Sequence, residues 1–161
     1  MMLLLLLLTT AAALAETEIV SNIDGTEYTI SDANDWNAFC DMLTDGETFS
    51  GKTVKLGANI EVTRMAGGQD HEFCGTFDGQ GYTLTFNYTA EDSYCAPFRY
   101  TNGATIMKLN VAGTITTSKK YAAGLISKAY GTTDITDCRA SHLRPNERRF
   151  PQNTGVRTVE H

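Results

Sequence analysis

Short runs of alternating apolar and polar residues dominate this chain, and the clearest run begins within the segment Gly75–Phe86. Apolar side chains occupy every second position there: Tyr82, Leu84, Phe86 and Tyr88. A period of two is typical of a strand that buries one face and exposes the other. Gly79 and Gly81 precede the run and favour a sharp turn. The pattern therefore predicts a tight turn that leads directly into a short strand.

Similar turn-and-strand units recur at intervals of ten to fifteen residues from Phe49 onward. The strand centres that we assign are Leu56, Leu84, Leu109 and Ile135, which lie 28, 25 and 26 residues apart. A repeat near 26 residues, rich in Gly, Thr and β-branched residues and without a helix in each unit, favours a solenoid of stacked strands. A β-sandwich is the alternative, because it also has short strands at regular spacing.

One helix is predicted, near residues 32–45. Its apolar positions follow the i, i+3, i+4, i+7 pattern of a single helical face: Trp36, Phe39, Cys40 and Leu43. Asp32 is suited to the N-cap, and Gly46 to the C-terminal stop. We expect this helix to cap the N-terminal end of the strands, where backbone groups would otherwise stay unpaired.

The first fifteen residues differ from the rest of the chain. Residues 1–15 are an apolar run that ends in Ala13-Leu14-Ala15, the small-residue pattern of a signal-peptide cleavage site. A run this short falls below the ~20 residues of a membrane-spanning helix. The sequence thus predicts a cleaved signal peptide, a secreted or cell-surface location, and a mature domain over residues 16–138.

Charge is distributed unevenly between that domain and the C-terminal residues 139–161. Residues 16–138 hold 17 acidic and 8 basic side chains, whereas residues 139–161 hold 2 acidic and 5 basic ones. The acidic domain argues against nucleic acid as a partner. The tail lacks alternation, so we expect an irregular basic tail. It is either a segment that binds an anionic polymer or the product of a frameshift after Cys138.

Four cysteines lie in the predicted mature domain: Cys40, Cys74, Cys95 and Cys138. An even number in an exported chain permits two disulfides, with three possible connectivities. Cysteine also packs as a small apolar residue, so four free, buried thiols are the alternative. No C-x-x-C pair is present, which disfavours a zinc cluster.

Carboxylates are the first candidates for chemistry. Asp78 lies within the predicted turn, where its side chain can bond to the backbone. Asp134 and Asp137 are a possible acid–base pair, but residues three apart in a strand lie on opposite faces. We therefore predict structural roles and no catalytic residue.

A second cluster, Asp70, His71, Glu72 and Cys74, contains possible metal ligands. One His and one Cys make half of a zinc site, and no spaced Asp-x-Asp-x-Asp loop for calcium appears. We predict a solvated loop, with no metal and no cofactor. Asn87 begins an Asn-x-Thr glycosylation pattern, which we interpret as a strand end.

Residues 31–138 resemble the N-terminal part of bacterial surface proteins built on right-handed parallel β-helices. The resemblance rests on three segments: Asp35–Leu56, Phe73–Leu84 and Gly124–Ile135. The last is similar to a GLUG repeat, although Ser127 replaces its second glycine. The resemblance implies a mainly-β, right-handed parallel β-helix with one short N-terminal capping helix, continued by further rungs in a longer protein.

The function that this resemblance implies is adhesion or ligand display, without catalysis. Carbohydrate or a host surface protein would be the ligand, and no stable membrane insertion is expected. The Asp78-Gly79-Gln80-Gly81 segment also resembles a turn in pectin-degrading enzymes. The alternative is therefore a fragment of a pectin-lyase-like enzyme, which would need paired carboxylates on one face.

Overall fold

The computed structural model describes residues 19–22 and 24–140 of the 161-residue chain. Its described helix is α1 (Ala33–Thr44). The described strands are β1 (Val20–Ser21), β2 (Glu27–Ile30), β3 (Thr53–Leu56), β4 (Ile60–Val62), β5 (Thr76–Asp78), β6 (Thr83–Thr89), β7 (Phe98–Asn102), β8 (Thr105–Met107), β9 (Asn110–Thr116), β10 (Ile126–Tyr130), β11 (Asp134–Thr136) and β12 (Arg139–Ala140).

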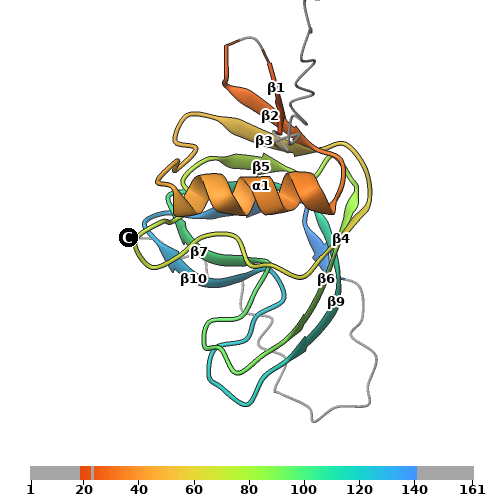
Figure 1. The fold of residues 1–161 in the computed structure, drawn as a ribbon, viewed down its shortest axis with the longest axis vertical. Helices are drawn as coiled ribbons and strands as arrows, with labels where there is room; N and C mark the ends of the chain where they lie inside the picture. Colours follow the sequence, from red (N-terminus) through yellow and green to blue (C-terminus); the bar gives the residue numbers. More distant parts are fainter. Residues whose placement is uncertain (1–18, 23, 141–161) are drawn as a thin grey trace, which may run out of the picture.

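These strands form three separate sheets (Figure 1). The first has the order β1-β2-β3-β5-β8-β11, the second β4-β6-β9-β12, and the third contains β7 and β10. All pairings are parallel except that of β1 with β2. The described fold is mainly β, with apolar side chains from the sheets filling a common core.

The prediction of a right-handed parallel β-helix is wrong for this structure, because its parallel sheets are not closed. The third sheet has only two strands, and the segment before Cys74 joins it only through isolated bridges at Ala66 and Phe73. Part of that segment pairs with itself, since Gly68 and His71 form an antiparallel bridge. Backbone groups used in this local pairing cannot extend the third sheet.

The register of the first sheet also corrects the predicted repeat. One column of paired residues runs across β2, β3, β5, β8 and β11: Tyr28, Val54, Phe77, Ile106 and Ile135. Leu84, by contrast, pairs with Ile60 and Val111 in the second sheet. The strand centres that we chose from sequence therefore mix two sheets, because apolar periodicity does not reveal which sheet a strand joins.

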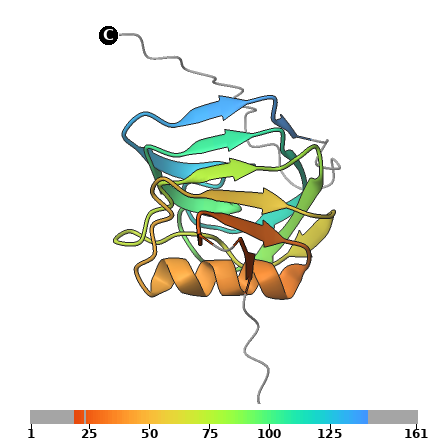
Figure 2. The ribbon, with the colours of Figure 1, turned by 90° about the horizontal axis from the view of Figure 1, so that it is seen from above.

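Helix α1 lies across one end of the stacked strands (Figure 2). It packs against β2 and β4, while β11 lies at the opposite end of the first sheet. Asp32 is the N-cap, and its carboxylate accepts from the backbone N–H groups of Asn34 and Asp35. The local signals near residues 32–45 thus correspond to an observed helix.

Aromatic rings fill the core beneath this helix. Trp36 and Phe39 are fully buried and meet Phe77 at centroid distances of 6.1 and 6.2 Å. Phe98 approaches Trp36 to 5.8 Å in an edge-to-face arrangement. Such contacts add to the free energy of burying large apolar surfaces.

Burial weakens toward the other end. Ile106 is fully buried, but its neighbour in the column, Ile135, is 54% exposed. β11 is the last strand of the first sheet, and no strand among the described residues pairs with its outer edge. Within residues 19–22 and 24–140, the core is therefore covered by α1 at one end, and no strand lies beyond β11 at the other.

Two details of the second sheet concern β9. Gly113 lies within β9 opposite Phe86. Its φ of +117° suits glycine, and a Cβ there would lie 2.1 Å from the Phe86 carbonyl oxygen. At the C-terminal end, β12 (Arg139–Ala140) pairs with β9 beyond the boundary that we placed at 138. The predicted signal peptide and the rest of the tail lie outside the described residues.

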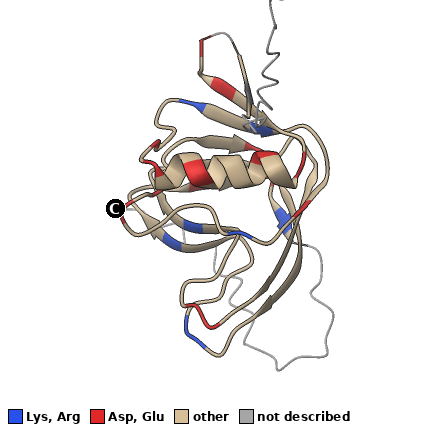
Figure 3. Cartoon of the chain, in the orientation of Figure 1, with Lys and Arg blue, Asp and Glu red and all other residues tan. Residues whose placement is uncertain are grey.

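Charged residues of both signs are distributed over the described helix, strands and loops (Figure 3). Acidic positions mark α1, whereas basic positions occur on both strands of the third sheet. These basic positions are Arg99 on β7 and Lys128 on β10. The third sheet thus carries positive charge in a chain whose formal net charge is −6.

Candidate functional site

Asp78 has a structural role, in agreement with its predicted place in a turn. Its Oδ1 accepts from the backbone N–H of Gln80 at 2.9 Å. Its Oδ2 lies 3.9 Å from Nζ of Lys108. The carboxylate therefore stabilises the turn after β5 and lies beside a cation.

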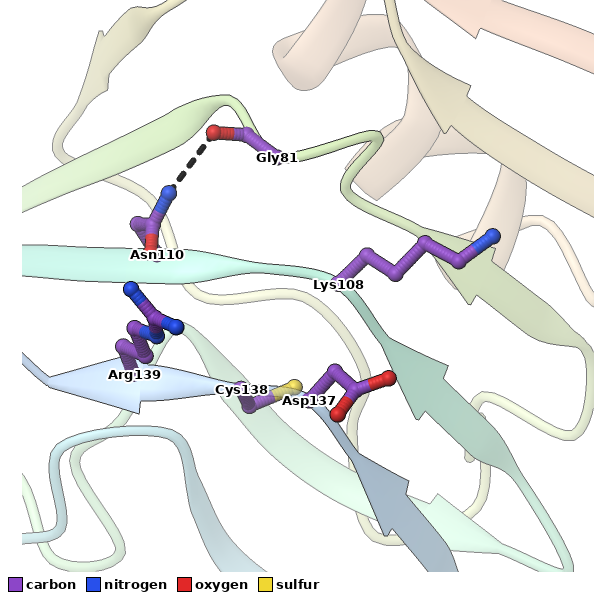
Figure 4. Close-up of a pocket in the computed structure, with 6 residues that line it drawn as sticks. All are labelled: Gly81, Lys108, Asn110, Asp137, Cys138 and Arg139. Atoms are coloured by element: carbon purple, nitrogen blue, oxygen red, sulfur yellow. Dashed lines mark hydrogen bonds between the residues drawn. The ribbon is translucent and has the colours of Figure 1, made fainter.

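Asp137 lines a shallow groove near β11 (Figure 4). The groove has a volume of about 580 Å³ and is lined by Gly81, Lys108, Asn110, Asp137, Cys138 and Arg139. Nδ2 of Asn110 donates to the Gly81 carbonyl at 2.6 Å. Lys108 and Arg139 point away from one another in this view. Asp137 is the one carboxylate among the described residues of the groove, so an acid–base pair of carboxylates is not assembled there.

The possible metal ligands between Asp70 and Cys74 are close in sequence but do not converge in space. Among the described residues, no group of three or more His, Cys, Asp and Glu side chains converges to hold a metal ion. The thiol of Cys74 instead donates to the Glu72 carbonyl at 3.5 Å. Nδ1 of His71 is buried without a hydrogen-bond partner.

Asn87 lies inside β6, not at the strand end that we expected. Its Nδ2 donates to Glu61 at 2.7 Å, and its Oδ1 accepts from the Thr114 backbone N–H at 3.1 Å. Both ends of the amide are used between adjacent strands. This asparagine therefore stabilises the second sheet.

The four cysteines of the described domain are free thiols. Cys40 and Cys95 are buried, which corresponds to the alternative of thiols that pack as small apolar residues. Burial raises the pKa of Cys40 to about 12 and also raises the pKa of Cys74, Cys95 and Cys138. These thiols remain protonated at neutral pH, and a nucleophilic thiolate is disfavoured.

A group of four tyrosines lies on and beside the third sheet, and among them Tyr121 is exposed, two are half-buried and Tyr100 is buried. We call it the tyrosine cluster: Tyr94, Tyr100, Tyr121 and Tyr130, with Lys128 among them. Tyr94 and Tyr121 stack with centroids 4.6 Å apart and 13° between their planes. Tyr100 and Tyr130 stack at 6.5 Å and 17°. Tyr121 is 59% exposed, so one of its faces is available to a ligand.

Backbone pairing between the two segments positions the ring of Tyr94 against that of Tyr121. Cys95 and Ala122 form a parallel bridge, which aligns the residue before each of them. The Tyr94 N–H donates to the Lys120 carbonyl at 3.1 Å, and the Cys95 N–H donates to the Tyr121 carbonyl at 2.9 Å. Tyr94 and Tyr121 also share a left-handed backbone, with φ of 59° and 68°. For non-glycine residues this conformation costs ~1–2 kcal/mol, and it directs both rings alike.

Lys128 joins the two stacks. Its Nζ lies 5.4 Å from the ring centroid of Tyr94 and 4.8 Å from that of Tyr130. These are cation–π distances, which hold the ammonium beside the rings. A hydrogen bond to Tyr130 raises the pKa of Lys128, which keeps its charge at neutral pH. The cluster thus combines an open aromatic face with a fixed positive charge.

The sequence analysis missed this cluster. Its four tyrosines are spread over Tyr94–Tyr130, and they meet because parallel pairing places β10 beside β7. The available signal was the distance of 27 residues between Tyr94 and Tyr121, close to the predicted repeat. That signal becomes informative only when the register of the segments is known.

Comparison with known proteins gives no relative for this chain. A helix with the length and apolarity needed to cross a membrane is not found among residues 19–22 and 24–140. Scans against protein-family models, curated proteins and solved structures found no match to this chain.

Proposed function

We propose that this chain is a non-catalytic, exported bacterial surface protein that binds carbohydrate through the tyrosine cluster. The observation that carries the proposal is the open ring of Tyr121, 59% exposed and stacked on Tyr94. Large aromatic groups left exposed beside polar side chains are typical of ligand sites. Export rests on the apolar pattern of residues 1–15, which lie outside the described structure.

Carbohydrate suits this surface for a chemical reason. One face of a pyranose ring presents mainly C–H groups, which pack on the negative face of an aromatic ring. The hydroxyl groups at the rim of the sugar need polar partners, which the tyrosine hydroxyls and Lys128 supply. The stack behind Tyr121 fixes the ring before a ligand arrives, which lowers the entropy cost of binding.

The test is binding of the purified chain to a panel of polysaccharides, measured by calorimetry. Tyr121→Ala should weaken binding about tenfold or more, by analogy with nucleic-acid bases, whose stacking on an aromatic side chain contributes ~1–3 kcal/mol. Tyr82→Ala is the matched control, because Tyr82 is also exposed, at 37%, but lies outside the cluster. Its binding should be unchanged.

Four results would overturn the proposal. The first is that the chain binds none of the polysaccharides, and the second is that the two variants lose affinity equally. Release of new reducing ends from a bound polymer would show hydrolysis or lysis and would favour the enzymatic alternative. Binding to a host protein that persists after enzymatic removal of its glycans would identify protein, not carbohydrate, as the ligand.

A further inference from the structure

Lys128 has a charge that no described carboxylate neutralises. Its ammonium contacts the rings of Tyr94 and Tyr130, and it takes part in none of the ion pairs of the described residues. A cation held between aromatic rings keeps its attraction for an incoming anion. The tyrosine cluster is therefore suited to bind a ligand that carries negative charge.

The acidic groups near this region already have partners. Glu91 accepts from the Ser118 hydroxyl and lies 3.7 Å from Nζ of Lys119. Asp92 accepts from the Tyr88 hydroxyl at 2.5 Å and lies 3.9 Å from Arg99. These carboxylates are thus engaged in the loops beside the cluster, and Lys128 remains free to meet an external carboxylate.

We propose that the tyrosine cluster binds acidic polysaccharides, with one sugar ring on Tyr121 and the anionic group of a nearby unit of the same polymer on Lys128, which contacts Tyr94 and Tyr130. This inference rests on the proposed carbohydrate-binding function and deepens it by naming the class of sugar. An acidic polymer carries both an apolar sugar face and a negative charge on each unit, so one unit can stack on Tyr121 while the charge of another meets Lys128. A neutral sugar would leave the ammonium without an anionic partner.

The experiment compares each acidic polymer with its own uncharged form. Alginate, hyaluronan and polygalacturonate are titrated beside their carboxyl-reduced counterparts, and chondroitin sulfate tests whether sulfate serves as well as carboxylate. We expect at least tenfold tighter binding to a charged polymer than to its reduced form. The difference should shrink as sodium chloride rises from 50 to 500 mM, because salt screens an exposed charge pair.

Lys128→Gln should remove this preference, so that the charged and the reduced polymer bind alike, and Lys128→Arg should retain it. Lys108→Gln is the matched control, because Lys108 is an exposed lysine on the groove side of the molecule. Circular dichroism and a thermal melt should show that Lys128→Gln folds normally, since this side chain contributes no core packing.

The outcomes separate the two proposals. Equal binding to charged and reduced polymers, still dependent on Tyr121, would overturn the inference about acidic sugars while the carbohydrate-binding function stands. An equal loss of affinity for the charged polymer in Lys128→Gln and Lys108→Gln would also overturn the inference about acidic sugars, because the attraction would then be a general charge effect. Binding to neither kind of polymer would overturn both proposals.

Discussion

The indole Nε1 of Trp36 donates a hydrogen bond to the carbonyl oxygen of Arg64 at 2.9 Å, across 28 residues of sequence. This bond ties α1 to the segment after β4, and the guanidinium of Arg64 reaches back to Asp41 at 2.7 Å. Trp36 itself is fully buried. The helix is therefore fixed by apolar packing and by polar contacts at its edge.

The first prediction concerns this anchor. Trp36→Ala should lower the free energy of unfolding by about 3–5 kcal/mol, because it leaves a large cavity among the core rings. Trp36→Phe should cost about 1–3 kcal/mol, since it keeps an aromatic ring but leaves the Arg64 carbonyl unpaired. Urea denaturation measures both values. A red-shifted tryptophan emission that iodide quenches freely would contradict the buried position.

The second prediction concerns the two faces of β6. Leu84 is fully buried, and Leu84→Asp should unfold the domain because a carboxylate would enter the core unpaired. Thr83 is half-buried on the opposite face, and Thr83→Asp should cost less than about 1 kcal/mol. Thermal melts of the two variants give the comparison. Equal destabilisation would mean that the two faces are assigned incorrectly.

A third prediction tests the glycine within β9. Gly113→Ala should destabilise the domain by about 1–3 kcal/mol or more, because its new Cβ would meet the Phe86 carbonyl at 2.1 Å. Gly124→Ala is the control, since no atom lies within 4 Å of that position and its φ is not in the left-handed region. Its unfolding free energy should change by less than about 1 kcal/mol. If Gly113→Ala were as stable as the parent chain, β6 and β9 would not approach this closely.

The fourth prediction concerns the thiols. Cys40 should resist alkylation by iodoacetamide in the native protein, because burial excludes the reagent and raises the thiol pKa to about 12. In guanidinium without reductant, Cys40, Cys74, Cys95 and Cys138 should all react, since each is a free thiol. Mass spectrometry of labelled peptides measures both states. Absence of labelling in guanidinium would show that the cysteines are paired in disulfides.

The raised pKa of Cys40 also predicts a dependence of stability on pH. The folded state keeps the proton above the ordinary thiol value of 9.0 and up to about 12, whereas the unfolded state loses it near 9.0. The contribution of Cys40 to stability is therefore complete below pH 9 and is lost as pH rises through that window. In Cys40→Ala, this part of the alkaline decline should disappear.

The amino-acid sequence by itself determined the local elements. The helix near residues 32–45 follows from an N-cap aspartate and an apolar stripe, both of which act within one or two turns. Alternation likewise located the strand that contains Leu84 and Phe86, since a strand with one buried face must repeat every second residue. These signals depend only on neighbouring residues.

Only the tertiary structure decided which strands share a sheet and which side chains meet. The pairing of Phe77 with Ile106, and of Leu84 with Val111, depends on backbone register between distant segments. The same register stacks Tyr94 on Tyr121 and sets Lys128 beside Tyr94. Apolar periodicity leaves register undetermined, because several alignments of short strands bury similar apolar area. The open sheets and the tyrosine cluster therefore emerged from long-range pairing.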